Sequence, residues 1–293
     1  MELRGAMTAL VTPFTATGEV DIEMLRAHVK RQIEAGIDAL VPVGTTGESP
    51  TLTHDEHRRV IEVVVEVARD QTGGMTPVIA GTGSNSTHEA VAMTRHAKDC
   101  GADAALVVAP YYNKPTQEGL YRHYSTIADV GLPIILYNIP GRCGVELTVD
   151  TVVRLSDVNH VIAIKEATGK LDVASEIASR CGLTILSGDD SLTLPLMSVG
   201  ATGVISVLAN LLPERIKALT TAVESSDFDA ARKLHLELFP VFKAIFLETN
   251  PIPIKAAMHL AGLDSGMLRL PMCPMSEGPL AKMTQVLTSA GAL

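Results

Sequence analysis

Lys165 is the residue whose type and position point most directly to carbonyl chemistry. It follows the apolar run 161–164 without a break, so its amine is expected at the end of a buried strand, partly removed from water. Desolvation lowers the pKa of an ammonium group, and a neutral amine is the nucleophile that attacks a ketone to form an imine. A shift from about 10.4 to near 7 requires about 4–5 kcal/mol from the surrounding pocket. The alternative is a solvated lysine at a strand end.

Tyr137 ends a second apolar run, 133–137, and is expected near the same mouth. A phenol there can pass protons to and from a reacting carbon or oxygen. The alternative is a core tyrosine with a satisfied hydroxyl. All five tyrosines of the chain fall between residues 111 and 137. Tyr121 and Tyr124 lie at a helical step of three in the middle of this stretch, and we expect them only to pack.

Two further segments offer groups for binding a carboxylate. Thr45 and Thr46 lie between two glycines, which allow the backbone to approach a ligand closely. No GK[ST] sequence follows, so this is not a Walker loop. Arg142 follows Tyr137 by five residues, and its guanidinium suits a substrate carboxylate. A surface arginine is the equally simple alternative.

The sequence gives little support for a metal site. The run 54–57, His-Asp-Glu-His, resembles a ligand cluster but is not HExxH, and its position indicates the first turn of a helix. Asp189 and Asp190 are adjacent acidic residues, but no histidine is near them in the sequence. We therefore expect no metal.

Eight short apolar runs would position these groups. Most are continuously apolar rather than alternating, which is typical of parallel strands covered on both faces. The runs are 6–11, 38–43, 77–80, 104–109, 133–137, 161–164, 183–186 and 203–207. Helical patterns separate them, and this alternation predicts a (β/α)8 TIM barrel whose active site lies at the carboxyl ends of the strands. A doubly wound open sheet is the alternative, but the GxGxxG sequence expected there is missing.

Local signals mark where the helices begin and end. Ile22, Leu25, Val29 and Ile33 recur at helical spacing, and Gly36 follows at the position where helices commonly end. Helix starts are predicted at Thr53 with Glu56 and at Ser86 with Glu89, two capping boxes, and at Thr116.

The barrel pattern ends near residue 222, and only helices are predicted after it. They cover about 227–247, 252–262 and 276–289. We therefore divide the chain into a catalytic barrel, 1–224, and a C-terminal helical extension, 225–293. The extension is expected to pack on the barrel or on a neighbouring subunit.

Composition excludes several other classes of protein. The 293 residues are 46% hydrophobic and 19% charged, as in ordinary globular chains. A net charge of −9 argues against nucleic acid and anionic membranes as partners. No apolar run approaches the roughly 20 residues that span a bilayer. The first residues lack the features of a signal peptide, so we expect a cytoplasmic protein.

The four cysteines match no metal knuckle and no CxxC pair. They are Cys100, Cys143, Cys181 and Cys273. In a reducing compartment we expect free thiols at or near the core.

Four sequence motifs together carry a family resemblance that extends over essentially the whole chain. They are Gly-Thr-Thr-Gly-Glu at 44–48, Pro-Tyr-Tyr-Asn-Lys-Pro at 110–115, Tyr-Asn-Ile-Pro-Gly-Arg at 137–142 and Lys-Glu-Ala-Thr-Gly at 165–169. The chain resembles the dihydrodipicolinate synthases, also called 4-hydroxy-tetrahydrodipicolinate synthases. These lyases belong to the lysine-dependent, class I aldolase superfamily, which also includes N-acetylneuraminate lyase.

The resemblance implies a reaction between pyruvate and L-aspartate 4-semialdehyde in diaminopimelate and lysine biosynthesis. Lys165 would form a Schiff base with pyruvate, whose enamine attacks the aldehyde; the substrate amine then displaces the lysine and closes a ring. Tyr137, Thr45 and Tyr112 would form the proton relay, with Tyr112 reaching into the site of a neighbouring subunit. The resemblance implies no cofactor and no metal beyond this covalent imine.

The resemblance also implies how the substrates are held and how the protein assembles. Thr46 and the backbone at Thr45, Gly188 and Ile205 would hold pyruvate, and Arg142 would bind the semialdehyde carboxylate and steady the relay. The family is usually a homotetramer, a dimer of two tight dimers.

A regulatory site for L-lysine is the last expectation from the resemblance. In feedback-regulated members lysine binds at the dimer interface, and the matching positions here are Ser49, Pro50, His54, His57, Asn85, Glu89 and Tyr111. Pro50 replaces a frequent alanine, but that contact is made by the backbone carbonyl. The simpler alternatives are that Glu89 caps a helix and that both histidines belong to a helix start.

Three other functions remain open at this stage. The nearest is another pyruvate-dependent aldolase, which would cleave a 2-keto-3-deoxy sugar acid or N-acetylneuraminate; Tyr112 and Arg142 in their motifs argue against it. A metal-dependent barrel hydrolase or class II aldolase and a non-catalytic metabolite-binding homologue are the more distant alternatives.

Overall fold

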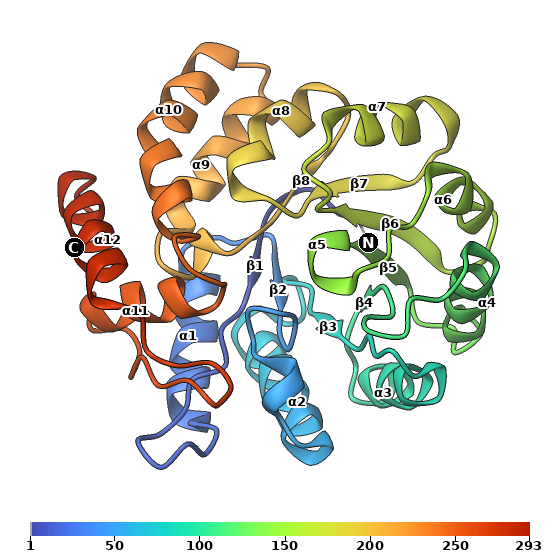
Figure 1. Ribbon diagram of the computed structural model, residues 1–293, viewed down its shortest axis with the longest axis horizontal. Coiled ribbons are helices and arrows are strands. Elements are labelled where there is room, and N and C mark those ends of the chain that lie inside the picture. Colours follow the sequence, from blue (N-terminus) through green and yellow to red (C-terminus); the bar gives the residue numbers. More distant parts are fainter. Residues whose placement is uncertain (1) are drawn as a thin grey trace.

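Eight parallel strands form the centre of the molecule in the computed structural model, which describes residues 2–293 (Figure 1). They are β1 (Gly5–Ala9), β2 (Ala39–Val41), β3 (Ile79–Gly81), β4 (Ala104–Val108), β5 (Ile134–Asn138), β6 (Val161–Glu166), β7 (Thr184–Ser187) and β8 (Gly203–Ser206). Each predicted run contains or overlaps one strand. Their order is β2-β1-β8-β7-β6-β5-β4-β3, and a parallel bridge between Leu40 and Val78 joins the two ends of this order. The (β/α)8 barrel is therefore confirmed, and the open sheet is excluded.

Helices follow the strands and surround the barrel (Figure 1). They are α1 (Ile22–Glu34), α2 (His54–Thr72), α3 (Thr87–Asp99), α4 (Gln117–Ala128), α6 (Val149–Ser156), α7 (Leu171–Arg180), α8 (Thr193–Ser198) and α9 (Pro213–Glu224). Four shorter helices of residues 2–293 lie in the loops that follow the carboxyl ends of strands. They are η1 (Ser49–Thr51), α5 (Pro140–Cys143), η2 (Asp190–Leu192) and η3 (Leu208–Asn210).

The predicted helix signals are confirmed with one exception. Gly36 follows α1 with a φ of 75°, and Thr53 and Glu56 form both halves of the capping box at α2. At α3 the hydroxyl of Ser86 accepts from the backbone N–H of Glu89. The carboxylate of Glu89, however, accepts from the Ser84 hydroxyl at 2.7 Å. The second half of that predicted capping box is therefore wrong, because a nearer donor takes the carboxylate.

Strand alternation decides which side chains enter the barrel. Successive side chains of a strand point to opposite faces. In β5, Ile135 and Tyr137 belong to the inner apolar cluster, whereas Ile134 and Leu136 pack in the outer layer against the helices. In β6, Ala163 belongs to the inner cluster, so Lys165, two residues later, faces the same interior.

Three helices follow the barrel and lie along one side of it (Figure 1). They are α10 (Phe228–Ala244), α11 (Ile252–Leu260) and α12 (Glu277–Ser289), in agreement with the predicted ranges. α10 packs against α9 and α12, and α11 packs against α12. The boundary between residues 224 and 225 falls between α9 and α10, and the division into two units stays a prediction.

The four cysteines are free thiols in different surroundings. Cys143 is buried, while Cys100 and Cys181 are half-buried. Cys273 is exposed in the loop between α11 and α12, so the expectation of a near-core position is wrong for this residue. No helix within residues 2–293 combines the length and apolarity needed to cross a membrane.

Candidate active site

Lys165 and Tyr137 face each other at the carboxyl ends of two neighbouring strands. β5 and β6 pair in parallel, and their register places Tyr137 directly beside Lys165. The Nζ atom of Lys165 lies 4.4 Å from the centroid of the Tyr137 ring. Each residue is only 5% exposed. The two residues singled out from the sequence therefore form one buried pair at the mouth of the barrel.

Burial gives Lys165 the property that imine chemistry requires. Loss of hydration lowers the pKa of its ammonium group from 10.5 to about 8. The negative charge of Asp190 opposes this change, and the positive charge of Arg142 adds to it. At pH 7 roughly one amine in ten is then neutral, compared with roughly one in three thousand for an unperturbed lysine. The amine is thus available as a nucleophile.

Tyr137 is held in its neutral form by the same burial. Loss of hydration raises the pKa of the phenol to about 12, while the hydroxyl of Thr45 and the charge of Arg142 act against this increase. A neutral phenol can donate its proton and accept another, as a relay requires. Thr45 and Tyr137 also line one small cavity of ≈30 Å³. The structure therefore brings Thr45 to the Tyr137–Lys165 pair.

A strained turn carries Thr45 and Thr46. The backbone N–H of Gly47 donates to the Gly44 carbonyl at 3.1 Å, and that of Glu48 donates to the Thr45 carbonyl at 3.2 Å. The residues that flank the turn, Val43 and Glu48, have φ values of 56° and 53°. A left-handed conformation is unusual for residues with side chains, above all for a β-branched one, and such strain concentrates at functional sites.

Gly188 has no room for a side chain. A Cβ atom there would lie 2.6 Å from the Cβ of Ala167 and 3.2 Å from the Cε of Lys165. Its N–H donates to the Glu166 carbonyl at 2.7 Å. Glycine therefore lets the backbone after β7 lie against Lys165, as expected for a group that contacts the same ligand. Ile205, in β8, belongs to the inner cluster and is fully buried.

Asp190 is a buried residue that the sequence reasoning considered only for a metal. Its carboxylate accepts from the Ser206 hydroxyl and from the backbone N–H of Val207 at 2.9 Å and of Leu208 at 3.3 Å. It thereby ties the end of β7 to the end of β8. Burial raises its pKa to about 6, and its charge acts on Lys165. Its position directly after the Gly188-Asp189 strand end was the available signal.

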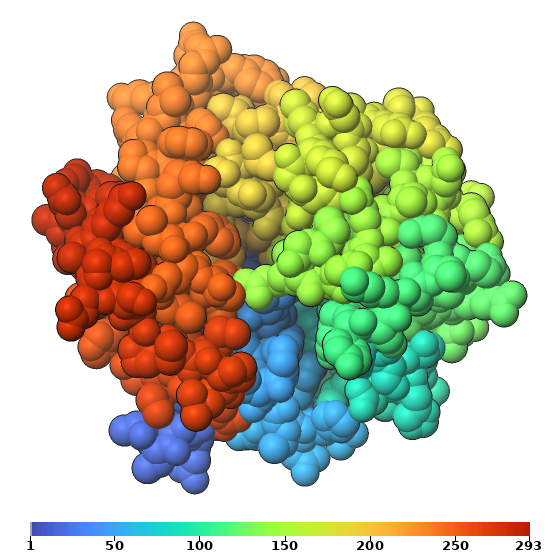
Figure 2. Space-filling view, viewed as in Figure 1, coloured from blue at the N-terminus to red at the C-terminus, as the bar shows by residue number. Residues whose placement is uncertain are grey.

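Arg142 lies at the rim of the site, on α5. Its guanidinium donates to the backbone carbonyl of Asn250 at 2.8 Å, and both residues line a cavity of ≈570 Å³. Figure 2 shows the surface hollowed near the middle of this face, between the segment that contains α10 and the strand-end loops. Arg142 therefore stands where a carboxylate could reach it, and its charge acts on both Lys165 and Tyr137.

Asn250 is a residue of this site that the sequence reasoning missed. Its side-chain amide nitrogen donates to the Thr46 hydroxyl at 3.0 Å, while its backbone carbonyl accepts from the Arg142 guanidinium. Its side-chain Oδ1 is buried and has no hydrogen-bond partner within residues 2–293. The only signal in the sequence is that Pro251 and Pro253 break the chain between the predicted helices 227–247 and 252–262, which indicates a connection and not a site residue.

Tyr112 is not brought to the other candidates within one chain. It is 89% exposed, and its φ of 73° turns the loop at this point. Its exposure fits a residue that reaches another molecule, but its role stays a prediction.

The residues expected to bind lysine gather in a second place. A pocket of ≈150 Å³ is lined by Ser49, Pro50, His54, His57, Glu89 and Tyr111. Asn85 lies beside them, and its amide donates to the Tyr111 carbonyl at 3.1 Å. His57 is held by the Gly81 carbonyl at 2.7 Å, and burial lowers its pKa. Ser49 also lines the small cavity of Thr45 and Tyr137, so the two places adjoin.

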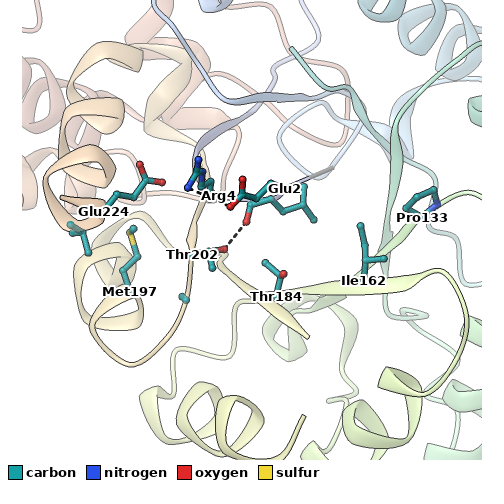
Figure 3. A pocket seen from close by; sticks show the side chains of 11 residues that line it. Glu2, Arg4, Pro133, Ile162, Thr184, Met197, Thr202 and Glu224 are labelled. Carbon is teal, nitrogen blue, oxygen red and sulfur yellow. Dashed lines mark hydrogen bonds and ion pairs between the residues drawn. The ribbon is translucent and has the colours of Figure 1, made fainter. Parts of the chain in front are cut away.

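A cavity larger than those of the candidate site lies at the amino ends of the strands, and Figure 3 shows its lining. It measures ≈880 Å³ and is lined at the amino ends of β5, β6 and β7 by Pro133, Ile162 and Thr184. Glu2 and Arg4, which form an exposed ion pair with a 3.4 Å separation, complete its rim. None of the predicted site residues lines it. Chemistry rather than size therefore identifies the candidate active site.

The histidines and carboxylates of the described chain do not form a metal cage. Within residues 2–293, no group of three or more His, Cys, Asp and Glu side chains is arranged to hold a metal ion. His54 and His57 line the second pocket instead, and Asp190 is hydrogen-bonded to β8.

Comparison with known proteins gives full-length similarity. A family model described as the dihydrodipicolinate synthetase family matches residues 2–290. The 4-hydroxy-tetrahydrodipicolinate synthase of Citrifermentans bemidjiense is 54% identical over 287 residues, which cover 97% of both chains. The chloride-inhibited dihydrodipicolinate synthase of Acinetobacter baumannii, solved in complex with pyruvate, is 42% identical with a TM-score of 0.96 over 100% of both chains. The lysine-bound DHDPS of Cyanidioschyzon merolae is 39% identical with a TM-score of 0.95 over 99% of both chains.

Proposed function

This chain belongs to the dihydrodipicolinate synthetase family, and we propose that it condenses pyruvate with L-aspartate 4-semialdehyde through an imine on Lys165. The product is 4-hydroxy-tetrahydrodipicolinate, on the route to diaminopimelate and lysine. The observation that carries the proposal is the buried amine of Lys165, placed 4.4 Å from the ring of Tyr137 and with its pKa lowered to about 8. Pyruvate bound to the relative from Acinetobacter baumannii supports the same substrate here.

The proposed reaction begins with attack of the Lys165 amine on the pyruvate ketone. Loss of water gives the imine, and loss of a methyl proton gives the enamine. The enamine carbon attacks the aldehyde, whose oxygen takes a proton from the relay of Tyr137, Thr45 and Tyr112. The amine of the second substrate then attacks the imine carbon, which closes the ring and releases Lys165. No electron leaves or enters the substrates, so the reaction needs no redox cofactor.

The groups around Lys165 would hold the substrate carboxylates. We assign the pyruvate carboxylate to the Thr46 hydroxyl and the backbone at Thr45, with the backbone at Gly188 and Ile205 on the other side. The closeness of Gly188 to Lys165 supports this assignment. Arg142 would bind the carboxylate of the semialdehyde, which its planar guanidinium fits.

The function is tested by measuring product formation from pyruvate and L-aspartate 4-semialdehyde. The same protein is offered 2-keto-3-deoxygluconate and N-acetylneuraminate, the substrates of the alternative aldolases. We expect the protein to condense pyruvate with L-aspartate 4-semialdehyde. The cleavage rates of 2-keto-3-deoxygluconate and of N-acetylneuraminate should both stay at background. We expect full condensation activity after exhaustive chelation. Cleavage of a sugar acid faster than the condensation would overturn the assignment, and loss of activity on chelation would overturn the metal-independent mechanism.

Imine formation should depend on pH through Lys165. Because only the neutral amine attacks, the rate should rise about tenfold per pH unit below the pKa of about 8 and level off above it. The measurement is borohydride trapping of the pyruvate imine at short times across pH 6 to 10. Since the charge of Arg142 lowers the pKa of Lys165, Arg142→Gln should move the inflection to higher pH. An inflection near pH 10 in the unmodified protein would contradict the desolvated amine.

Assembly is part of the proposed mechanism. Tyr112 is exposed and lies outside the buried site of its own chain, which supports the view that it completes the site of a neighbouring subunit. We therefore propose at least a dimer, and a tetramer of two tight dimers by analogy with the family.

We also propose that L-lysine inhibits the reaction by binding the ≈150 Å³ pocket. The gathering of the predicted residues around one pocket and the lysine bound to the relative from Cyanidioschyzon merolae support this. Millimolar L-lysine should lower the condensation rate, and Glu89→Gln should weaken the effect because a charge in the pocket is lost. L-norleucine, which has the same six-carbon chain and α-amino acid group but lacks the side-chain ammonium group, serves as the control. A rate unchanged by millimolar L-lysine would remove the regulatory proposal.

A further inference from the structure

A buried ion pair connects helix α11 with the turn that carries Thr45 and Thr46. The ammonium group of Lys255, which is fully buried, donates to Glu48 Oε1 at 2.8 Å and to the Thr12 carbonyl at 2.9 Å. The Glu48 side chain is only 1% exposed. Burying two charges removes them from water, and such a pair often stabilises a fold no better than apolar residues of the same size. Its presence beside the candidate site therefore calls for another reason.

The backbone conformation of Glu48 indicates that the ion pair serves the turn. Its φ of 53° lies in the left-handed region, which glycine adopts far more easily than a residue with a side chain. A glutamate at this position is explained by what its carboxylate does. One oxygen accepts from Lys255, and the other accepts from the backbone N–H of Arg269 at 3.2 Å. Two residues of the C-terminal extension thus fix the end of the turn.

Further hydrogen bonds connect Glu48 and Lys255 to the segment that contains Thr45. The N–H of Glu48 donates to the Thr45 carbonyl at 3.2 Å. The hydroxyl of Thr12 donates to the Gly47 carbonyl at 2.7 Å, while the carbonyl of Thr12 accepts from Lys255. The single ammonium group of Lys255 therefore holds the turn both through the Glu48 side chain and through Thr12, in the segment after β1, whose hydroxyl donates to the Gly47 carbonyl.

Lys255 is placed to position other residues rather than to react itself. Its Nζ lies 4.3 Å from the centroid of the Phe14 ring, which covers it, and the guanidinium of Arg269 lies 4.4 Å from the same centroid. Its other contacts are the Glu48 carboxylate and the Thr12 carbonyl. A ketone has no room beside this amine, unlike that of Lys165, which belongs to the barrel mouth.

We propose that Lys255 is a positioning residue for the condensation. Through Glu48 it holds the turn 44–48 so that Thr45 stays beside Tyr137 and Thr46 stays beside the pyruvate carboxylate. This inference rests on the proposed function, which it deepens. It also makes the C-terminal extension a part of the catalytic unit, because the contact joins residues 207 positions apart.

The test compares Lys255→Met with the double variant Glu48→Gln/Lys255→Met. We expect kcat for the condensation to fall about 10- to 100-fold in both, because a misplaced relay group costs this much even when the change is remote. We expect the pyruvate imine still to form on Lys165 in both. The melting temperature should fall in the single variant, where the Glu48 carboxylate loses its cationic partner, and recover in the double variant, where neither charge of the pair remains. Low turnover in a stable double variant is the result that a purely structural role would not give.

His28→Gln is the matched control. His28 Nε2 lies 3.2 Å from Asp264 Oδ2 in a similarly buried contact between α1 and the C-terminal extension that includes no residue of the turn. Its loss should lower the melting temperature and leave kcat unchanged. The proposal is overturned if kcat in Lys255→Met stays within about twofold of the unmodified protein, or if kcat recovers with the melting temperature in the double variant.

Two further outcomes keep the test decisive. If Lys255→Met does not fold, the double variant carries the comparison alone. If the unmodified protein does not condense the two substrates, the proposed function fails, and the crystal structure of the double variant decides the positioning role by itself. A displaced turn at 44–48 would support that role, and an unchanged turn would overturn it.

Discussion

Lys165→Ala is expected to lower the condensation rate by more than about 10³-fold, the scale on which enzymes lose activity when their nucleophile is removed. The alanine variant has no amine at the barrel mouth that can form the imine, and Lys255, the other buried lysine within residues 2–293, is paired with Glu48. The fold should remain intact, because the change removes a desolvated amine that is only 5% exposed. Product formation from pyruvate and L-aspartate 4-semialdehyde measures the rate, and peptide mass mapping after borohydride reduction with pyruvate locates the adduct.

Lys170→Ala is the control for this experiment. Lys170 belongs to the same segment, but its ammonium group is 57% exposed and pairs with Glu146 at 2.9 Å. Its loss should change neither the rate nor the adduct. An adduct on a lysine other than Lys165, or near-normal turnover in Lys165→Ala, would refute the mechanism.

Tyr137→Phe should lower kcat by about 10²- to 10⁴-fold, the usual contribution of a positioned acid–base group. Phenylalanine keeps the ring that lies 4.4 Å from Lys165 Nζ and removes only the hydroxyl, so the packing of the inner cluster should survive. The measurement is kcat for the condensation together with the melting temperature. The loss should appear in kcat while the melting temperature stays nearly unchanged.

Tyr124→Phe provides the contrasting variant. Tyr124 is fully buried on α4 in the outer apolar layer, and its hydroxyl donates to the Val107 carbonyl at 3.2 Å. Removing this hydroxyl should cost about 1 kcal/mol of stability and leave kcat within about twofold. If the two variants affected kcat equally, Tyr137 would have to be regarded as a packing residue.

The parts of the fold that sequence reasoning reached depend on local periodicity. Continuous apolar runs marked all eight strands, and the positions of Tyr137 and Lys165 at the ends of two of these runs predicted that both lie at the barrel mouth. The glycines around Thr45 and the spacing of Arg142 from Tyr137 indicated two further site residues, which the structure places near the same pair. These features depend on residues that are close together in the sequence, so they can be predicted without a structure.

The features that were missed depend on contacts between distant parts of the chain. Asn250 meets Thr46 across 204 positions, and Lys255 meets Glu48 across 207. The sequence marked the first only as a helix break and the second not at all, because docking of the C-terminal helices decides both contacts. A contact between residues close in the sequence was also mispredicted. The Glu89 carboxylate accepts from the Ser84 hydroxyl and not from the predicted backbone N–H of Ser86.

The separation between the ≈880 Å³ cavity and the catalytic pair matters for a search for inhibitors. A screen by binding alone does not distinguish compounds at this cavity, at the amino ends of β5, β6 and β7, from compounds at Lys165. Compounds at the cavity would leave pyruvate free to bind. A screen that reports displacement of pyruvate from Lys165 selects instead for ligands of the smaller, polar mouth, where a carboxylate and a carbonyl group are the features to build in.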